Sequence, residues 1–435
     1  MEWPLALLLT LGSLIGLMLA GIPVAFCFLA VNLIGAFIWW GGEQGLMQIG
    51  VSLMESVTTF VLLPIPLFIL MGEVIFRSEI APKMIDAVDK WLGRVPGRLG
   101  LLAVGSGTLL STLTGVSMAS VAILGSTLVP EMERRGYKKP MSLGPILGSG
   151  AIAMFIPPSA LAVLLGAIAQ ISIGKLLVAI IVPGMLMAAI YTLYIILRCK
   201  LQPSLAPVYD VTSASLSEKL AATVRYVLPI GFIIFLVIGV ILMGIATPTE
   251  AAASGSIGCF LLAAGYRKLN WEVAKKSIMG TFQVTVMLFM VMSAAIAFSQ
   301  ILIFSGVSRG LIELATGLLL PPIIIIIIMQ VIVLIMGMFM EGSAILMVTI
   351  PLFMPIISTM HFNPMWFGVL LLLALKIGGV SPPFGLDVFT MKGVAPPNTT
   401  IGDIYRAALP FIGLDLIVIA LITAFPVLVL WLPGA

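Results

Sequence analysis

Charged residues are scarce in this chain. Only 9% of its 435 residues are Asp, Glu, Lys or Arg, against about 25% in soluble domains. Hydrophobic residues make up 61%, and the mean hydropathy is +1.22. Several stretches without any charge, such as 99–130, 226–249 and 277–308, are long enough to cross a hydrocarbon core of ~30 Å. The composition therefore predicts a polytopic protein of the lipid bilayer that binds no nucleic acid.

Residue types that serve metal, redox or phosphate chemistry are also few. The chain has one histidine, His361, and three cysteines, and no phosphate-binding glycine loop. A single histidine excludes an intramembrane metalloprotease, and an odd number of cysteines implies no disulfide framework. Without a nucleotide-binding loop the chain does not hydrolyse ATP itself. We therefore expect a protein that is not an enzyme and whose residues form no histidine or cysteine metal centre.

Proline, by contrast, recurs at fixed intervals. Prolines in comparable apolar surroundings are separated by 225 residues: Pro23 and Pro248, Pro130 and Pro355, and the pairs Pro157–Pro158 and Pro382–Pro383. A fixed offset is the signature of an internal duplication. In an apolar chain, a duplication with helix-breaking prolines at matching places is typical of secondary transporters that bind their substrate near the bilayer midplane.

Lys and Arg gather in particular loops and thereby predict the orientation of the chain. Loop 77–98 carries five of them and loop 131–139 carries four, so both should be cytoplasmic. The 32 charge-free residues between them, 99–130, must then enter the membrane and return as a re-entrant hairpin. Loops 40–46, 306–316 and 359–365 contain only Arg309 and should lie outside.

The charge pattern of the loops and the duplication together predict an all-α fold of two repeats, each with five spans and one hairpin. The first repeat covers 1–198 with its hairpin near 99–130. A cytoplasmic linker covers 199–224, and the second repeat covers 225–435 with its hairpin near 317–358. Because five spans is an odd number, the second repeat is inverted, and both termini should be periplasmic. The prolines should also break the helices that contain them.

Each double proline frees two backbone carbonyls from helical hydrogen bonds. A proline removes the N–H that would bond the carbonyl four residues earlier, so Ala153 and Gly378 are among the residues with freed carbonyls. Na⁺ is one partner for such oxygens in a membrane, and the hydroxyls of Ser159 and Ser381 can add ligands. The alternative is a kinked helix whose carbonyls are satisfied by neighbouring helices or water.

The most polar parts of the two hairpins lie at their tips. The first tip reads 111–117, STLTGVS, and the second reads 340–343, MEGS. Gly115 and Gly342 permit tight turns, and helix N-termini that follow such turns favour anions. The tips therefore predict ion or substrate binding, although small hydroxyl residues also allow close packing between helices.

Three ionisable residues lie inside apolar segments, where each is a functional candidate by default. They are Glu341, Lys376 and Asp387. We expect Lys376 to attract a substrate carboxylate, or else to form an ion pair with Asp387 or Glu341. The residues expected to contact the substrate are Lys376, Ser159, Ser343 and Asp387. Thr247, Pro248 and Glu250 fit a capping box at a helix start instead.

Four motifs together resemble the large membrane subunit of TRAP (tripartite ATP-independent periplasmic) transporters. They are 244–253 (GIATPTEAAA), 337–342 (GMFMEG), 381–385 (SPPFG) and 156–159 (IPPS). The resemblance extends over essentially the whole chain. It implies Na⁺-driven uptake of a small organic acid across a bacterial inner membrane by an elevator motion. It also implies two partners, a small four-span membrane subunit and a periplasmic substrate-binding protein.

The same resemblance implies two Na⁺ sites. The first would comprise Thr114, Gly115, Ser117, Ala153, Ile156 and Pro158, and the second Gly342, Gly378, Ser381 and Phe384. The chain departs from the family at Val116, within a tip that usually reads Ser-Gly-Ser, and at Lys376, a position expected to be uncharged. Two other functions remain open: a stand-alone Na⁺-coupled anion carrier of the same architecture, and a membrane scaffold. A scaffold has no need of symmetric helix breaks.

Overall fold

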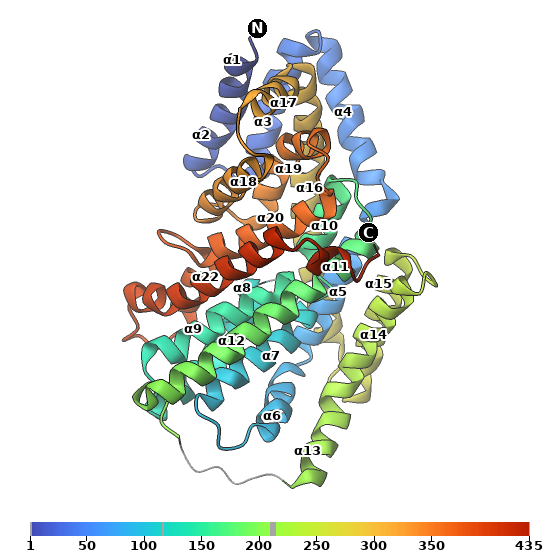
Figure 1. Cartoon of the computed structure of the whole chain (residues 1–435). Helices are drawn as coiled ribbons and strands as arrows, with labels where there is room; N and C mark the ends of the chain where they lie inside the picture. The colour runs from blue at the N-terminus through green and yellow to red at the C-terminus, as the bar shows by residue number, and fades with distance from the viewer. Residues whose placement is uncertain (1, 115–116, 209–214, 435) are drawn as a thin grey trace.

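The computed structural model describes residues 2–114, 117–208 and 215–434, without side-chain detail at Ala81 and 111–114. The described residues form helices and no strands, which confirms the predicted all-α fold (Figure 1). In the first half the elements are α1 (Trp3–Leu7), η1 (Leu8–Gly12), α2 (Ser13–Leu19), α3 (Val24–Trp39), α4 (Glu43–Thr58), η2 (Phe60–Leu62), α5 (Pro64–Arg77), α6 (Ala81–Trp91), α7 (Arg98–Thr114), α8 (Ser117–Arg134), α9 (Lys139–Gly150), η3 (Ala151–Met154), α10 (Ala160–Ile168), α11 (Ile173–Ala179) and α12 (Ile181–Leu201).

The second half has elements of similar order. They are η4 (Pro203–Leu205), α13 (Leu216–Ala222), η5 (Thr223–Val227), α14 (Leu228–Leu242), α15 (Pro248–Gly265), α16 (Trp271–Phe304), α17 (Val307–Gly317), α18 (Pro322–Gly337), α19 (Gly342–Thr359), α20 (Pro364–Val380), α21 (Leu386–Val394), α22 (Ile401–Ala424) and α23 (Val427–Leu430). Within the described residues, six helical segments are long and apolar enough to cross a membrane, and five shorter ones are also apolar.

The duplication is visible in the helix boundaries. α8 begins at residue 117 and α19 at 342, while α9 begins at 139 and α20 at 364, so both pairs of starts are 225 residues apart. Each predicted hairpin segment holds two helices, α7 with α8 and α18 with α19. The repeats are not identical, and one difference is that α16 is continuous over 34 residues, whereas its counterpart is divided into α4 and α5. Pro64 and Pro66 follow that division, and proline cannot continue the hydrogen bonding of a preceding helix.

α9 and α20 occupy the centre of the molecule. Every residue from Met141 to Gly150 of α9, and from Met365 to Gly378 of α20, is buried. Glycines permit the close packing: a Cβ atom at Gly144 would lie 2.6 Å from the backbone oxygen of Ala407 in α22. These two helices lead directly into the two proline breaks, so the breaks lie in the interior, where their backbone groups are shielded from lipid.

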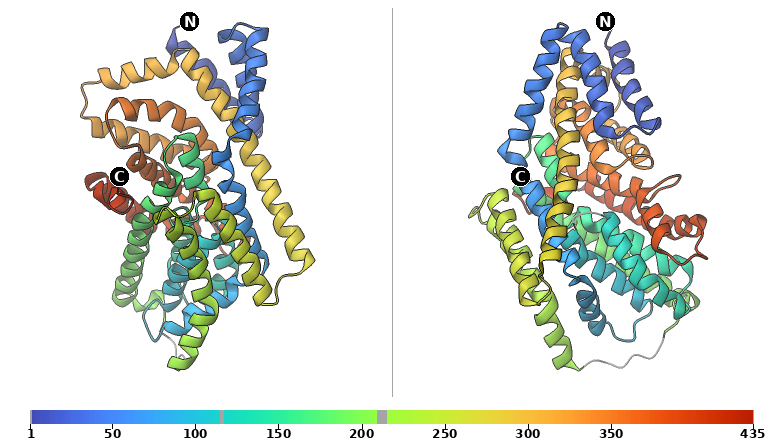
Figure 2. Two further views of the ribbon diagram at one scale, coloured as in Figure 1. Left: turned by 90° about the vertical axis from the view of Figure 1, so that its right-hand side faces the viewer. Right: turned by 180° about the vertical axis from the view of Figure 1, so that it is seen from behind.

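The remaining helices surround this centre. α16 runs beside α3, α4 and α5 through much of the length of the molecule (Figure 2). α13, α14 and α15 lie along one side, and the N-terminus lies at one end near α17 (Figure 1). Thr247 caps α15 as expected, since its side chain accepts a hydrogen bond from the backbone N–H of Glu250 at 3.3 Å.

Candidate functional site

Both proline pairs interrupt a buried helix. In the first repeat, α9 passes into the short 3₁₀ helix η3, and α10 begins only after Ser159. In the second, α20 ends at Val380 and α21 begins at Leu386. The Pro157–Pro158 and Pro382–Pro383 peptide bonds are cis. The backbone between the two helices of each pair is irregular, so its polar groups require partners other than a helical ladder.

The second break is held together by short-range hydrogen bonds. The N–H of Ser381 donates to the carbonyl of Gly378 at 3.1 Å, and its hydroxyl donates to the carbonyl of Ile377 at 2.7 Å. The N–H of Gly385 donates to the carbonyl of Met338, between α18 and α19, at 3.2 Å. The break is therefore bonded to the tip of its own hairpin, and the carbonyl of Gly378 keeps a lone pair free for a second partner.

Glycine makes this contact between hairpin and break possible. A Cβ atom at Gly378 would lie 2.5 Å from the Cα atom of Gly337 in α18, and one at Gly337 would lie 2.8 Å from the Cα atom of Gly378. Any side chain at either position would displace the opposing backbone. The structure therefore brings the predicted residues Gly378, Ser381 and the hairpin of Gly342 together.

Each hairpin also contacts the opposite repeat. Ser117, at the start of α8, donates a hydrogen bond to a carboxylate oxygen of Asp387 in α21. At the equivalent place, a Cβ atom at Gly342, the first residue of α19, would lie 3.3 Å from Leu161 in α10. The second helix of each hairpin thus begins against the short helix that follows the other repeat's break. The two tips and the two breaks form one group.

A cavity of about 360 Å³ lies where these segments meet. One wall is formed by residues of α5 and α16, and the others by α8, α10, the α18–α19 hairpin and the ends of α20 and α21. Its lining includes five residues that the sequence had marked as site residues: Ser117, Pro158, Gly342, Ser343 and Asp387. A volume of this size suits a small organic molecule.

The other predicted site residues are not among the described lining of this cavity. Ala153 is fully buried in η3 and Ile156 is partly buried. Phe384 is 53% exposed and packs on Phe339, with 5.6 Å between ring centroids. Ser159 caps α10 by accepting from the N–H of Ala162 at 3.3 Å. Gly115, and the side chain of Thr114, lie outside the described residues.

Lys376 is not among the described residues that line the cavity, where we expected it to contact the substrate. Its side chain is fully buried, and its Nζ is 2.6 Å from each carboxylate oxygen of Asp415 in α22. It also donates to the hydroxyl of Tyr191 in α12, which in turn donates to Asp415. This geometry corresponds to the ion-pair alternative, with Asp415 in the place of Asp387 or Glu341. A buried ammonium group requires such a partner.

Sequence reasoning missed Asp415, although the sequence contains a signal for it. Asp415 is the only charged residue between 407 and 435, and a lysine at membrane depth calls for a carboxylate in another apolar segment. Glu73 of α5, which lines the cavity, was missed because it lies near the end of its span, where charges are ordinary.

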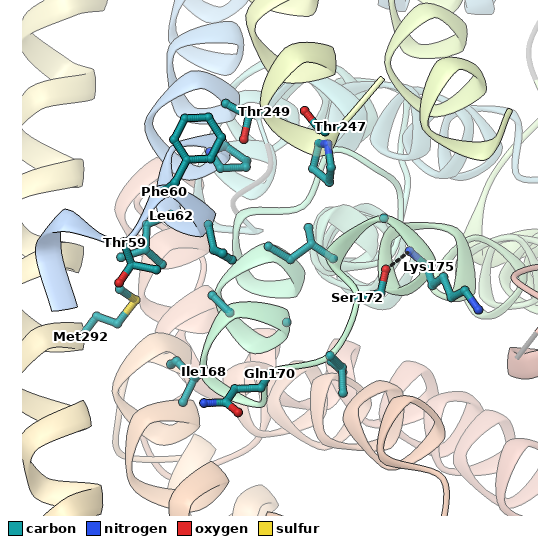
Figure 3. A pocket seen from close by; sticks show the side chains of 18 of the residues that line it. Thr59, Phe60, Leu62, Ile168, Gln170, Ser172, Lys175, Thr247, Thr249 and Met292 are labelled. Carbon is teal, nitrogen blue, oxygen red and sulfur yellow. Dashed lines mark hydrogen bonds between the residues drawn. The ribbon is translucent and has the colours of Figure 1, made fainter. Parts of the chain in front are cut away.

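A second, larger cavity of about 1080 Å³ lies at another place (Figure 3). Thr59 and Phe60 line one part of it, Gln170 and Lys175 lie near the start of α11, and Thr247 lies at the start of α15 (Figure 3). None of the site residues predicted from the sequence is in its described lining. The smaller cavity, where both tips and both breaks meet, is therefore the candidate site.

Comparison with known proteins agrees with these motifs. Residues 11–428 match the family model "Tripartite ATP-independent periplasmic transporter, DctM component". The chain is 30% identical over 390 residues, 89% of each chain, to the C4-dicarboxylate TRAP transporter large permease protein DctM of Pseudomonas aeruginosa. It is 30% identical over 421 residues, 97% of each chain, to the ectoine TRAP transporter large permease protein TeaC of Halomonas elongata. It is 28% identical to the 2,3-diketo-L-gulonate TRAP transporter large permease protein YiaN of Escherichia coli, over 94% of each chain.

A solved structure with a similar fold is that of the Alcanivorax borkumensis YdaH transporter. It superposes with a TM-score of 0.64 at 16% sequence identity and covers 91% of each chain. At this identity the likeness concerns the fold alone. The family match spans nearly the whole chain and includes both proline breaks and both hairpins. The chain therefore belongs to the DctM family, the large permease subunits of tripartite ATP-independent periplasmic transporters.

Proposed function

We propose that this chain is the permease through which a Na⁺ gradient drives uptake of a small organic acid across a bacterial inner membrane. The observation that supports this best is the meeting of two hairpin tips and two helix breaks around one cavity. Discontinuous helices of this kind bind coupling ions and substrate in secondary transporters. A periplasmic binding protein would deliver the solute, and a small four-span subunit would complete the membrane part.

The groups at the breaks suit Na⁺. Backbone carbonyls near Gly378 and Ala153 and the hydroxyl of Ser381 are oxygen donors, and hard cations prefer oxygen ligands. Thr114, Gly115, Ser117, Ile156, Pro158, Gly342 and Phe384 complete the two proposed ligand sets. When bound, Na⁺ would couple its own movement down its concentration gradient to the binding of the solute in the cavity. Because the chain holds the ligands on separate elements, ion binding would also hold hairpin and break together.

An elevator motion is consistent with the walls of the cavity. The hairpins and broken helices supply most of its lining, while α5 and α16 supply one wall. If the first group slides along α5 and α16, the cavity moves across the membrane with it, and access alternates between the two sides. α5 and α16 would then belong to a fixed scaffold that the small subunit supports.

The first test uses the reconstituted assembly. In proteoliposomes that contain the chain and the small subunit, we expect radioactive sodium to enter when the binding protein, purified with its native solute, is added outside. Entry should fall to the level of empty liposomes when either partner is omitted. Sodium entry stimulated by periplasmic solutes alone, without any partner, would favour the stand-alone carrier.

We also propose that the second repeat is inverted relative to the first and that both termini are periplasmic. Loop 131–139 has four Lys and Arg residues and loop 359–365 has none, which places the equivalent loops on opposite sides. Cysteines introduced at Lys138 and Asn363 should react with a membrane-impermeant thiol reagent from opposite faces of oriented vesicles. The native cysteines are buried, so background labelling should be low. Reaction of both from one face would refute the inversion.

A further inference from the structure

The charged side chains around the cavity are of one sign. Three carboxylates, those of Glu73, Glu341 and Asp387, are in its described lining, and no Lys, Arg or His is among those residues. The side chains of 111–116, which the structure does not describe, are uncharged by sequence. Arg77 is 2.9 Å from Glu73 and offsets that charge. Two acidic groups, Glu341 and Asp387, remain without a cationic partner of their own in the lining.

These two carboxylates stand where an anionic solute would otherwise bind. Glu341 caps α19, since its side chain accepts from the N–H of Ser343 at 2.9 Å and from the Ser343 hydroxyl. Asp387 accepts from Ser117, the first residue of α8. The N-terminus of a helix attracts anions because of its free N–H groups and its dipole. At the second hairpin tip a carboxylate of the chain itself caps the helix, and at the first a carboxylate bonds the hydroxyl of the helix's first residue.

Lys376 lies within electrostatic range of Asp387, but its charge is balanced by another carboxylate. It is the nearest lysine in sequence to the second break, yet Asp415 binds it with both carboxylate oxygens. The pair is fully buried and neutral as a unit. A solute dianion in the cavity would therefore meet two like charges, which repel it.

We propose that the solute recognised in this cavity bears a cationic nitrogen, such as an ammonium or amidinium group, that pairs with Asp387 and Glu341. A small zwitterion fits best, because with one Na⁺ at each break the site as a whole would be neutral and would favour a solute without net charge. This inference rests on the proposed function and narrows its organic acid to an acid that also carries a positive charge.

The first experiment measures the electrostatic potential of the cavity without knowledge of the solute. Leu386, which lines the cavity beside Asp387 and is 37% exposed, is replaced by cysteine in the purified chain. In Na⁺-free buffer, where the two carboxylates are not balanced by bound Na⁺, its reaction rates with a trimethylammonium-ethyl and a sulfonatoethyl methanethiosulfonate are compared with those of free 2-mercaptoethanol. We expect the ratio of the cationic to the anionic rate to exceed that of the free thiol by at least about tenfold, as an excess charge of this size near the thiol would produce.

Neutral variants assign the effect to its source. Asp387→Asn and Glu341→Gln should each lower the rate ratio severalfold, while both side chains can still accept their present hydrogen bonds. Glu313→Gln serves as control, because Glu313 lies on the exposed surface of α17 and is 64% exposed. The same measurement on Met287→Cys, on the α16 wall, shows whether the rate ratio at Leu386→Cys reflects the cavity or only a local distortion of α21. A ratio equal to that of the free thiol at both positions would overturn the proposal.

The second arm identifies the solute itself. Mass spectrometry of the small molecule bound to the purified binding protein should find a compound with a cationic nitrogen, and Asp387→Asn should raise the concentration of its half-maximal uptake about tenfold or more. A dicarboxylate without such a nitrogen, taken up with Na⁺, would overturn this inference and leave the proposed function standing. Failure of sodium entry with any loaded binding protein would instead refute the proposed function.

Discussion

Replacing Gly378 by alanine should abolish most Na⁺-driven uptake while leaving the protein in the membrane. The added Cβ atom would lie 2.5 Å from the Cα atom of Gly337 and 2.9 Å from the carbonyl oxygen of Leu334. Both are backbone atoms, so no side chain can rotate to make room, and α18 would have to move away from α20. Overpacking of this kind costs about 1–3 kcal/mol or more. The displaced hairpin would also pull the carbonyl of Met338 away from the N–H of Gly385.

The measurement is the initial rate of sodium entry into proteoliposomes at saturating solute-loaded binding protein. We expect the Gly378→Ala rate to fall by roughly 10- to 100-fold, in proportion to that cost. Gly231→Ala in α14 is the matched control, because a Cβ atom there has nothing within 4 Å, and alanine is the better helix former. A normal rate in Gly378→Ala would show that the close contact between hairpin and break has no part in transport.

Replacing Lys376 by methionine should strongly destabilise the protein. The substitution leaves the Asp415 carboxylate buried with only the Tyr191 hydroxyl as partner. Removing one member of a buried ion pair costs about 3–5 kcal/mol. We therefore expect little protein in the membrane and a lower melting temperature in detergent, without a specific change in Na⁺ dependence.

A second substitution separates this ion-pair role from a substrate contact. Lys376→Met combined with Asp415→Leu removes both charges and should restore much of the abundance and melting temperature, because apolar replacements of buried pairs are often well tolerated. Lys276→Met is the surface control: Lys276 pairs with Glu272 at 2.6 Å but is 58% exposed, and such pairs contribute about 0–1 kcal/mol. Normal abundance of Lys376→Met, with only a higher solute concentration needed for half-maximal uptake, would instead support a role of Lys376 in binding the substrate.

The sequence predicted the local features of this fold well because each has a local cause. Proline removes a backbone donor wherever it stands, so the breaks after α9 and α20 could be placed from Pro157 and Pro382 alone. The first hairpin segment was placed from the charge-free stretch between two basic loops. α15 begins at its capping box because Thr247, Pro248 and Glu250 satisfy the first turn. Each of these inferences needs only neighbours in the chain.

Contacts between the repeats could not be predicted in the same way. Ser117 and Asp387 are 270 residues apart, and the offset of 225 relates each hairpin to its own counterpart, not to the segment it touches. The division between α4 and α5 has no equivalent in α16, because a duplication does not preserve every proline. For Lys376, sequence reasoning offered two nearby carboxylates, whereas folding brings a third, Asp415, across from α22.

Binding of the driving Na⁺ at the helix breaks can be measured directly in the reconstituted assembly. The quantity is the Na⁺ concentration for half-maximal solute uptake, for the unaltered chain and for Ser381→Ala. Thr359→Ala is the control, because Thr359 makes a similar hydrogen bond to the carbonyl four residues earlier, at 2.8 Å, but on an exposed surface. Loss of one ligand oxygen costs about 1–3 kcal/mol. We expect no uptake without a Na⁺ gradient, a requirement raised roughly 5- to 100-fold in Ser381→Ala, and no change in Thr359→Ala. Uptake that is equal with and without a Na⁺ gradient, or the same Na⁺ requirement in all three proteins, would contradict Na⁺ binding at the breaks.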